Sequence, residues 1–545
     1  MSVVRFPRSA LAVAAALLLL PAALATAQGP APPTPKFVSE DVRTRLGLDE
    51  KFGEEGAKGA VEINDGVIAF LNQRFDQALK EFDSARAKDD TLPPGRVMMA
   101  RLLAAANRLD LARMQLEVAA AERDSKGEQI EEPEVYLTLG RLALAEGRLT
   151  DALLEFEKTR SIVVTPDASA GKDNAAILRE IYAGLTTVYE QRADWDRAFQ
   201  SATVWATNAA KADRAQAELR LGRATFMRET ETTPEIMNTV ESHFQAAYDA
   251  DKVMAEERAT KDKTVSADEA RTIDHPKVSL AVLCAQRAGN DTKAANYDKF
   301  IKMAEDNFKL AIDESAKESD VLKARSHAAY SNWLRGLNKM ADAESQAKLA
   351  AELDPKSDAL RSLKAAIDLS RKNYKDAEPA FRQMYQKSPS NFFASNGLAL
   401  TLVGKGDDAS LKEAQEIAEM NVRAYGQKSA EALSTLGWVY FNNRRVADAA
   451  QALQQAVQVS NNQISADTAY FLANVLWENK QVDQAMQLLA GALQAGSNFL
   501  YREEAEEWMK ILSNKPGPRG SAPVSVTPTS NTGTNPAPKA PQTPK

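Results

Sequence analysis

The feature that most constrains the fold is an internal repeat with a period close to 34 residues. Similar segments recur along the chain, and each carries an alanine at the same place. These alanines are Ala78, Ala112, Ala152, Ala198, Ala343, Ala377, Ala414, Ala449 and Ala485. The steps between them are 34, 40, 46, 145, 34, 37, 35 and 36 residues, and we expect the long gap to hold degenerate units. Such a period is typical of a helix–turn–helix unit that stacks on copies of itself.

A small residue lies twelve positions before several of these alanines, on the preceding helix. Gly66, Gly140, Gly437 and Ala473 are the clearest cases. Small residues let two helices approach closely, and apolar residues at i, i+3, i+4 and i+7 bury one face of each helix. A single helical hairpin cannot cover that face, so neighbouring units must stack. The prolines agree with a helical body, because only nine of the 23 lie between residues 36 and 513.

These positions resemble those of the tetratricopeptide repeat family. In that family the first helix carries an apolar residue next to a Gly or Ala, as in Leu436-Gly437. The second helix carries the marked alanine, then an aromatic residue or Leu, and often a closing proline, as in Ala377, Phe381 and Pro389. The resemblance implies an all-α fold, a right-handed α-solenoid of about ten or eleven stacked helix–turn–helix repeats.

The resemblance covers most of residues 58–495 and divides the body by its regularity. Residues 58–320 are predicted as repeats with insertions, 321–499 as regular repeats, and 500–513 as a capping helix with one polar face. The register is weakest from 205 to 320. There, a charged stretch from Asp251 to Pro276 is either an elongated helix or a surface loop, and we favour a solvated excursion.

The N-terminal 27 residues have the three parts of a secretory signal peptide. Arg5 and Arg8 precede an apolar run of eleven residues, and Ala25-Thr26-Ala27 is the predicted cleavage site. The alternative is an uncleaved anchor, but a spanning helix needs about 20 apolar residues. We therefore expect an exported protein, in the periplasm, the cell envelope or outside the cell, with no transmembrane segment after signal removal. Residues 28–57 are predicted as a proline-rich leader and linker.

The C-terminal tail differs from the body in composition and in charge. Residues 514–545 hold eight prolines, four Lys or Arg and no acidic residue, which predicts an extended, disordered segment. We favour a spacer role, with a PxxP ligand role as the alternative. Residues 28–513 carry a net charge of −13, and this acidity argues against nucleic acid as a partner.

We find no motif for catalysis, for metal binding or for a cofactor. The chain has no phosphate-binding GxxxxGK[ST] and no HExxH sequence. His243, His275 and His327 are too far apart in sequence for two of them to share a helical turn. Cys284, the only cysteine, lies on an apolar helix face and is predicted to be core. We expect no cofactor, no metal and no enzymatic activity.

The candidate binding site is the concave surface of the last two repeats. First helices line the inner curve of such a solenoid, and their outward positions are not required for stacking. These positions are Ser434, Trp438, Phe441, Asn442, Tyr470, Asn474, Trp477 and Glu478. Phe393 and Asn396 extend the surface by one repeat. The alternative is that neighbouring helices cover these rings as part of the core.

An amphipathic wall of aromatic and amide side chains suits an extended peptide or a sugar ring. The resemblance to the tetratricopeptide repeat family, rather than any site, implies a scaffold that mediates protein–protein interaction or complex assembly in a bacterial cell envelope. The alternative is a glycan-binding or polysaccharide-export-assembly solenoid that stacks sugars on the aromatic wall.

Overall fold

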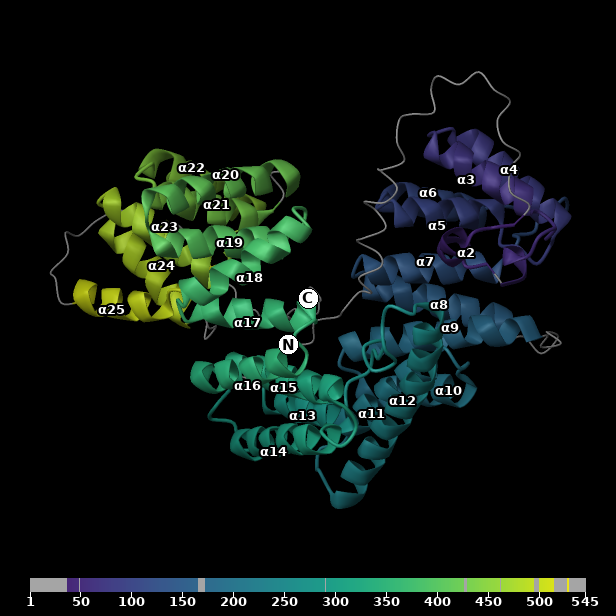
Figure 1. Ribbon diagram of the computed structural model, residues 1–545. Helices are drawn as coiled ribbons and strands as arrows, with labels where there is room; N and C mark the ends of the chain where they lie inside the picture. The colour runs from purple at the N-terminus through teal and green to yellow at the C-terminus, as the bar shows by residue number, and fades with distance from the viewer. Residues whose placement is uncertain are drawn as a thin grey trace, which may run out of the picture. The chain divides into compact units, whose positions relative to one another are not determined.

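The computed structural model describes residues 37–48, 50–164, 172–289, 291–425, 429–460, 462–494, 499–513 and 527–528 (Figure 1). The predicted signal peptide and nearly all of the proline-rich tail lie outside these residues. The chain forms two compact units, one up to Met254 and one from Ala255 onward. The boundary between the two units falls inside one long helix, α12. It does not coincide with residue 320, where the repeats were predicted to become regular.

The N-terminal unit is a series of antiparallel helices joined by short turns. Its elements are α2 (Glu40–Leu46), the 3₁₀ helix η1 (Glu50–Gly53), α3 (Ala60–Leu71), α4 (Phe75–Lys88), α5 (Gly95–Ala105), α6 (Leu109–Ala120), α7 (Pro133–Ala145), α8 (Leu149–Val163), α9 (Lys172–Gln191), α10 (Trp195–Asn208), α11 (Arg214–Arg228) and α12 (Pro234–Lys261).

The C-terminal unit continues the same pattern. Its helices are α13 (Pro276–Ala288), α14 (Tyr297–Ser315), α15 (Asp320–Gly336), α16 (Met340–Leu353), α17 (Asp358–Ser370), α18 (Tyr374–Lys387), α19 (Phe392–Lys405), α20 (Asp408–Tyr425), α21 (Ala430–Asn442), α22 (Val446–Val459), α23 (Ala466–Glu478), α24 (Val482–Gln494) and α25 (Arg502–Ser513). Two short strands, β1 (Gln463–Ile464) and β2 (Thr527–Pro528), pair in parallel.

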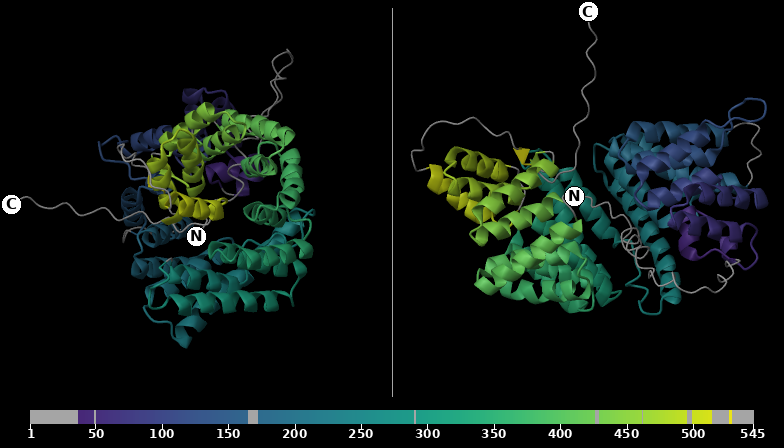
Figure 2. Two further views of the ribbon diagram at one scale, coloured as in Figure 1. Left: turned by 90° about the vertical axis from the view of Figure 1, so that its left-hand side faces the viewer. Right: turned by 90° about the horizontal axis from the view of Figure 1, so that it is seen from above.

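Within the described residues the helices from α3 to α24 form eleven successive pairs, so the fold is an all-α solenoid. The C-terminal unit curves tightly from α17 to α25 (green to yellow in Figure 2). The Lys372 ammonium, at the turn between α17 and α18, forms a 2.5 Å ion pair with Glu504 of α25. This curvature brings the last helix next to repeats that precede it by more than a hundred residues.

One turn geometry recurs between the two helices of a pair, even where the sequence differs. Two positions after the last residue of the first helix, the turn places one residue in the left-handed region, with φ between 55° and 73°. The residues are Gln73, Asn107, Gly147, Ala193, Asn338, Lys372, Arg444 and Lys480. A left-handed residue after a helix lets backbone N–H groups reach the last free carbonyls of that helix. Only one of the eight is glycine, so glycine spacing could not reveal the turn.

A glycine facing a buried ring joins neighbouring pairs. Phe156 of α8 is fully buried, and it lies against Gly140 of α7 and Gly184 of α9. A Cβ atom added at either glycine would overlap this ring. Phe381 of α18 lies against Gly397 of α19 in the same way. One ring from a second helix therefore contacts the first helix of the following pair, and this contact requires the small residue.

Two parts of the chain differ from the expectation. Residues 40–53, within the predicted linker, form α2 and η1, and Leu46 and Phe52 are buried in the N-terminal core. Ser39 accepts from the Val42 N–H at the start of α2, and Gly47 ends it with a φ of 64°. The charged stretch from Asp251 divides between the end of α12, which is indeed elongated, and a non-helical segment that buries Ile273.

The uncertain register resolves into the pairs α11/α12 and α13/α14, since Gly222 faces Phe244.

The glycine contact predicts a specific cost for one added methyl group. Gly397→Ala is expected to lower the free energy of unfolding by about 1–3 kcal/mol, because the new Cβ overlaps the fully buried Phe381 ring. The matched control is Gly336→Ala at the end of α15, where nothing lies within 4 Å of the added atom. Urea denaturation measures both variants. Equal stabilities would contradict the proposed role of the small residue.

Candidate functional site

The predicted concave positions lie on α21 and α23, which pack side by side with α19. Their exposure divides them into three groups. Ser434, Trp438 and Tyr470 are buried, Phe441, Asn442, Asn474 and Trp477 are half-buried, and Glu478 is exposed. The predicted residues therefore do come together, but only part of the surface that they form is open.

Trp438 is covered by the chain's own C-terminal cap. The Trp438 indole Nε1–H donates to the Tyr501 hydroxyl at 2.8 Å. The indole also stacks on Phe471, with ring centroids 4.6 Å apart and an angle of 10°. Tyr501 lies in the turn that precedes α25, so a segment from outside the two repeats fills the centre of their concave face.

Tyr470 and Trp477 meet the same cap. Tyr470 stacks on Tyr501 with centroids 5.1 Å apart and an angle of 5°, and Trp477 meets Trp508 of α25 edge-on at 5.7 Å. Burial raises the pKa of the Tyr470 hydroxyl to about 12. We call the turn Phe499–Tyr501 together with α25 the cap.

The alternative interpretation, in which other parts of the fold cover the rings, therefore holds for Trp438 and Tyr470. The two amides do not face a ligand either, because Asn442 and Asn474 each donate to a backbone carbonyl one turn earlier in their own helix, at 2.8 Å. The glycan alternative needs open rings for stacking, and two of its four rings are buried. Whether the half-buried remainder binds a partner stays a prediction.

The open part of this face lies at the N-terminal ends of the same helices. Phe393 of α19 is 46% exposed, with its ring 5.6 Å from Phe381. Three polar side chains near the starts of successive first helices, Asn396, Glu431 and Asp467, form a group that we call the acidic notch. Asn396 Nδ2 donates to Glu431 Oε1 at 3.1 Å, and the Leu500 N–H donates to Asp467 Oδ1 at 3.0 Å. Sequence reasoning found Asn396 but missed both carboxylates.

The two carboxyl groups of the notch are partly desolvated. Burial raises the pKa of Asp467 to about 6, and the nearby Glu431 charge adds to the shift. Desolvation also raises the pKa of Glu431, although this side chain retains access to solvent. Within the described part of the chain, no lysine or arginine forms an ion pair with either group.

The first helices of the N-terminal unit carry a different pattern, a series of paired charges. Arg141 of α7 forms a 3.0 Å ion pair with Glu180 of α9, and both side chains are about half exposed. Arg101 of α5 pairs in the same way with Glu134 of α7. Each arginine thus bridges to the next repeat. The exposed Arg141–Glu180 pair contributes little to stability, whereas the Arg101–Glu134 pair is largely shielded from solvent.

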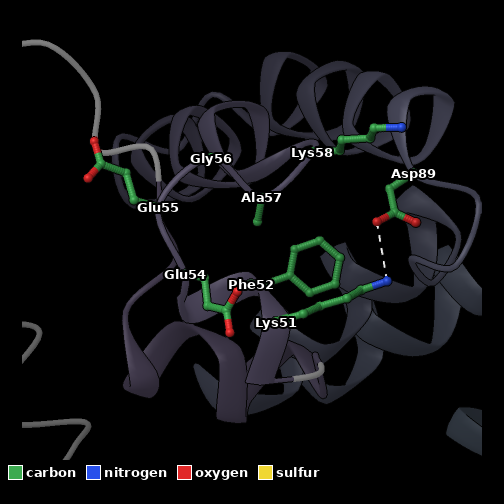
Figure 3. A pocket seen from close by; sticks show the side chains of 8 residues that line it. All are labelled: Lys51, Phe52, Glu54, Glu55, Gly56, Ala57, Lys58 and Asp89. Atoms are coloured by element: carbon green, nitrogen blue, oxygen red, sulfur yellow. Dashed lines mark ion pairs between the residues drawn. The ribbon is translucent and has the colours of Figure 1, made fainter.

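A separate pocket of about 240 Å³ lies near the N-terminal end (Figure 3). Its lining residues are Lys51, Phe52, Glu54, Glu55, Gly56, Ala57, Lys58 and Asp89. Lys51 forms a 3.3 Å ion pair with Asp89 and also donates to Thr91. Burial alone would raise the pKa of Asp89, but hydrogen bonds from Thr91 and Lys51 hold this pKa below its usual value. Of the charged groups that line the pocket, Lys51 and Asp89 are thus paired with each other.

The side chains that most often perform chemistry have structural partners. Cys284 is buried, and burial raises the pKa of its thiol to about 12, which keeps the thiol protonated. His243 is hydrogen-bonded to Glu218 and His327 to Gln346. In the described ranges, no group of three or more His, Cys, Asp or Glu side chains is placed to hold a metal ion. No helix in those ranges is both long and apolar enough to cross a membrane.

The family model of the tetratricopeptide repeat matches residues 440–502, from the end of α21 through α23 and α24. This part of the chain therefore carries the tetratricopeptide repeat. The matched residues include the half-buried Phe441, Asn474 and Trp477, and also Tyr501 of the cap. The resemblance found from the alanine and glycine spacing is thus confirmed. No curated protein matches the sequence.

Solved structures that resemble this chain share little sequence with it. A thermophilic TPR protein of Thermus thermophilus is 15% identical, and the match covers 35% of this chain and 98% of that one at a TM-score of 0.30. Yeast Tom70 is 14% identical over 84% and 95% of the two chains, with a TM-score of 0.31. A tetratricopeptide repeat protein of Parabacteroides merdae is 11% identical over 62% and 99%, with a TM-score of 0.32.

The contact between Trp438 and Tyr501 predicts a graded loss of stability. Tyr501→Phe is expected to lower the free energy of unfolding by about 1 kcal/mol, because the indole N–H of Trp438 loses its buried acceptor. Tyr501→Ala is expected to cost about 3–5 kcal/mol and to leave Trp438 accessible to solvent. Urea denaturation gives the energies, and acrylamide quenching of tryptophan fluorescence reports the exposure. Unchanged quenching in Tyr501→Ala would contradict the role of the cap.

Proposed function

We propose that this protein is an exported scaffold of a bacterial cell envelope that binds segments of partner proteins on the concave face of its C-terminal repeats. The single observation that carries the proposal is that this face already binds a segment of the same chain, the cap. Asp467 Oδ1 accepts a backbone N–H from the non-helical turn that begins at Phe499, and an aromatic ring from that turn fills the space between α21 and α23. The same combination of a backbone acceptor and an aromatic contact suits a segment of another protein.

The exposed residues around the cap support a partner at this face. Phe393 leaves almost half of its surface open although its ring borders the core, and it precedes Asn396 of the acidic notch by three residues on α19. A large apolar side chain beside partly desolvated polar groups is typical of a protein-binding surface. The proposal assigns no reaction to the chain.

Photocrosslinking tests the location of the binding face. A benzoylphenylalanine at position 393 is expected to capture proteins when the chain is produced in a bacterium and irradiated in intact cells. The matched control is the same residue at Leu349, which is 43% exposed on the second helix of its pair, α16. Equal capture at both positions would refute a specific concave site.

The compartment rests on the sequence of the leader. A basic start, an apolar run and the Ala25-Thr26-Ala27 site support export and cleavage before Gln28. The proportion of charged side chains in the body agrees with a soluble mature chain.

Export is tested with a reporter. Residues 1–35 fused to alkaline phosphatase without its own leader are expected to give active, periplasmic enzyme that begins at Gln28 of this sequence. Replacing Ala25 and Ala27 with Leu should stop the cleavage and leave a larger, membrane-bound product. Active enzyme confined to the cytoplasm, or none, would contradict export.

A further inference from the structure

The acidic notch holds hydrogen-bond acceptors without matching donors. Asn396 is 94% buried, since only 6% of its surface is exposed. Its amide nitrogen is bonded to Glu431, but its Oδ1 has no hydrogen-bond partner. The unpartnered oxygen belongs to the same planar amide group as the nitrogen that donates to Glu431. A buried acceptor left unpaired costs about 1–3 kcal/mol, so this place favours a donor.

The neighbouring carboxylates define which donor fits. Asp467 accepts one backbone N–H, and Glu431 accepts one amide N–H, which leaves further lone pairs on both groups. Each pair of groups comes from adjacent first helices, so the three side chains converge from α19, α21 and α23. A neutral donor would leave two carboxylates close together and uncompensated. A lysine ammonium or an arginine guanidinium supplies both the donors and the charge.

We propose that the acidic notch binds a lysine or arginine side chain of the chain's own C-terminal tail. The tail carries Lys515, Arg519, Lys539 and Lys545 and no acidic residue, whereas the body is acidic. The notch and the tail therefore have opposite charges and complementary hydrogen-bonding groups.

The position of the tail supports this occupant over others. It begins directly after Ser513, at the end of the helix that forms the cap. Thr527 and Pro528 pair with Gln463 and Ile464, and these strand residues lie just before the start of α23, where Asp467 is the second residue. Thr527 and Pro528 of the tail thus lie near the end of α23 that carries the notch. Since an extended chain spans at most about 3.6 Å per residue, Arg519 can reach about 30 Å from Thr527.

A consequence is that the tail competes with any other cation for the notch. A tethered segment acts at an effective concentration of about millimolar, so a partner that uses the same site must displace it. This inference concerns the tail alone and does not depend on the identity of a partner.

Fluorescence anisotropy with a labelled synthetic peptide of residues 514–545 tests the proposal. The receptor is the full chain in which Lys515, Arg519, Lys539 and Lys545 are all replaced by Gln, so that its own tail cannot compete. The peptide is expected to bind this receptor at least tenfold more tightly than it binds the wild-type chain. A peptide with the same four Gln replacements should bind at least tenfold more weakly.

The notch itself is tested in the same receptor. The double substitution Glu431→Gln with Asp467→Asn is expected to lower the affinity of the receptor for the peptide at least tenfold. The matched control, Glu416→Gln with Asp408→Asn, changes two exposed carboxylates of α20 by the same charge and should have little effect. Thermal melting confirms that each variant is folded. Equal weakening by both pairs of substitutions would show only general charge attraction and would overturn the proposal, as would an absence of binding.

Sedimentation of the wild-type chain shows whether the tail binds the notch of its own chain or the notch of a second copy. A monomer at all concentrations is the expected result, because the tail occupies the notch of its own chain. Dimers that disappear when the four tail cations are replaced would show that the tail binds a second copy, and this result would overturn docking within one chain.

Discussion

The structure depends on the close approach of three helices around one buried ring. Phe156 shows the arrangement most clearly, since it lies between the glycines of two first helices, Gly140 and Gly184. The ring belongs to a second helix, so a single residue joins its own pair to the next. In close packing of this kind, each atom added or removed lowers the stability of the fold. The small residue and the ring therefore set the spacing of the repeat.

This packing uses one face of each first helix and leaves another face free. In the C-terminal repeats the free face carries Trp438 and Tyr470, which would expose a large aromatic area if nothing covered it. Tyr501 and α25 cover that area, and the Trp438 N–H receives an acceptor at the same time. The end of the solenoid is thus closed from the concave side as well as along its axis. What stays open is the rim formed by Phe393 and the acidic notch.

The regular parts of the fold could be predicted from the sequence because they repeat. The marked alanines are buried in the second helices, and the small residues that precede them by twelve positions face rings or branched side chains. Gly437, for example, faces Leu453. Irregular parts could not be predicted in this way. Residues 40–53 do not repeat, and they fold because Leu46 and Phe52 find a core that distant residues supply.

The candidate site, like the fold, could be predicted from the sequence only where it follows the repeat. The spacing placed Ser434, Trp438 and Tyr470 on one face, and the structure brings them together. The burial of Trp438 and Tyr470, however, depends on Tyr501, whose position is set by the curvature of the whole unit and by no local pattern. Glu431 and Asp467 occupy the same place in adjacent repeats, about one helical turn before Ser434 and Tyr470. Reading each first helix one turn closer to its start would have found both carboxylates.

Hydrogen exchange of the intact chain, followed by mass spectrometry of its peptides, tests most directly whether the cap seals the concave face. The account predicts that the amides of Leu500–Ala505 exchange as slowly as those of α21 and α23, because the Leu500 N–H is bonded to Asp467 and the cap opens only with the repeats beneath it. Exchange of Leu500–Ala505 within seconds, while α21 and α23 stay protected, would show that the cap is not seated and would contradict this account.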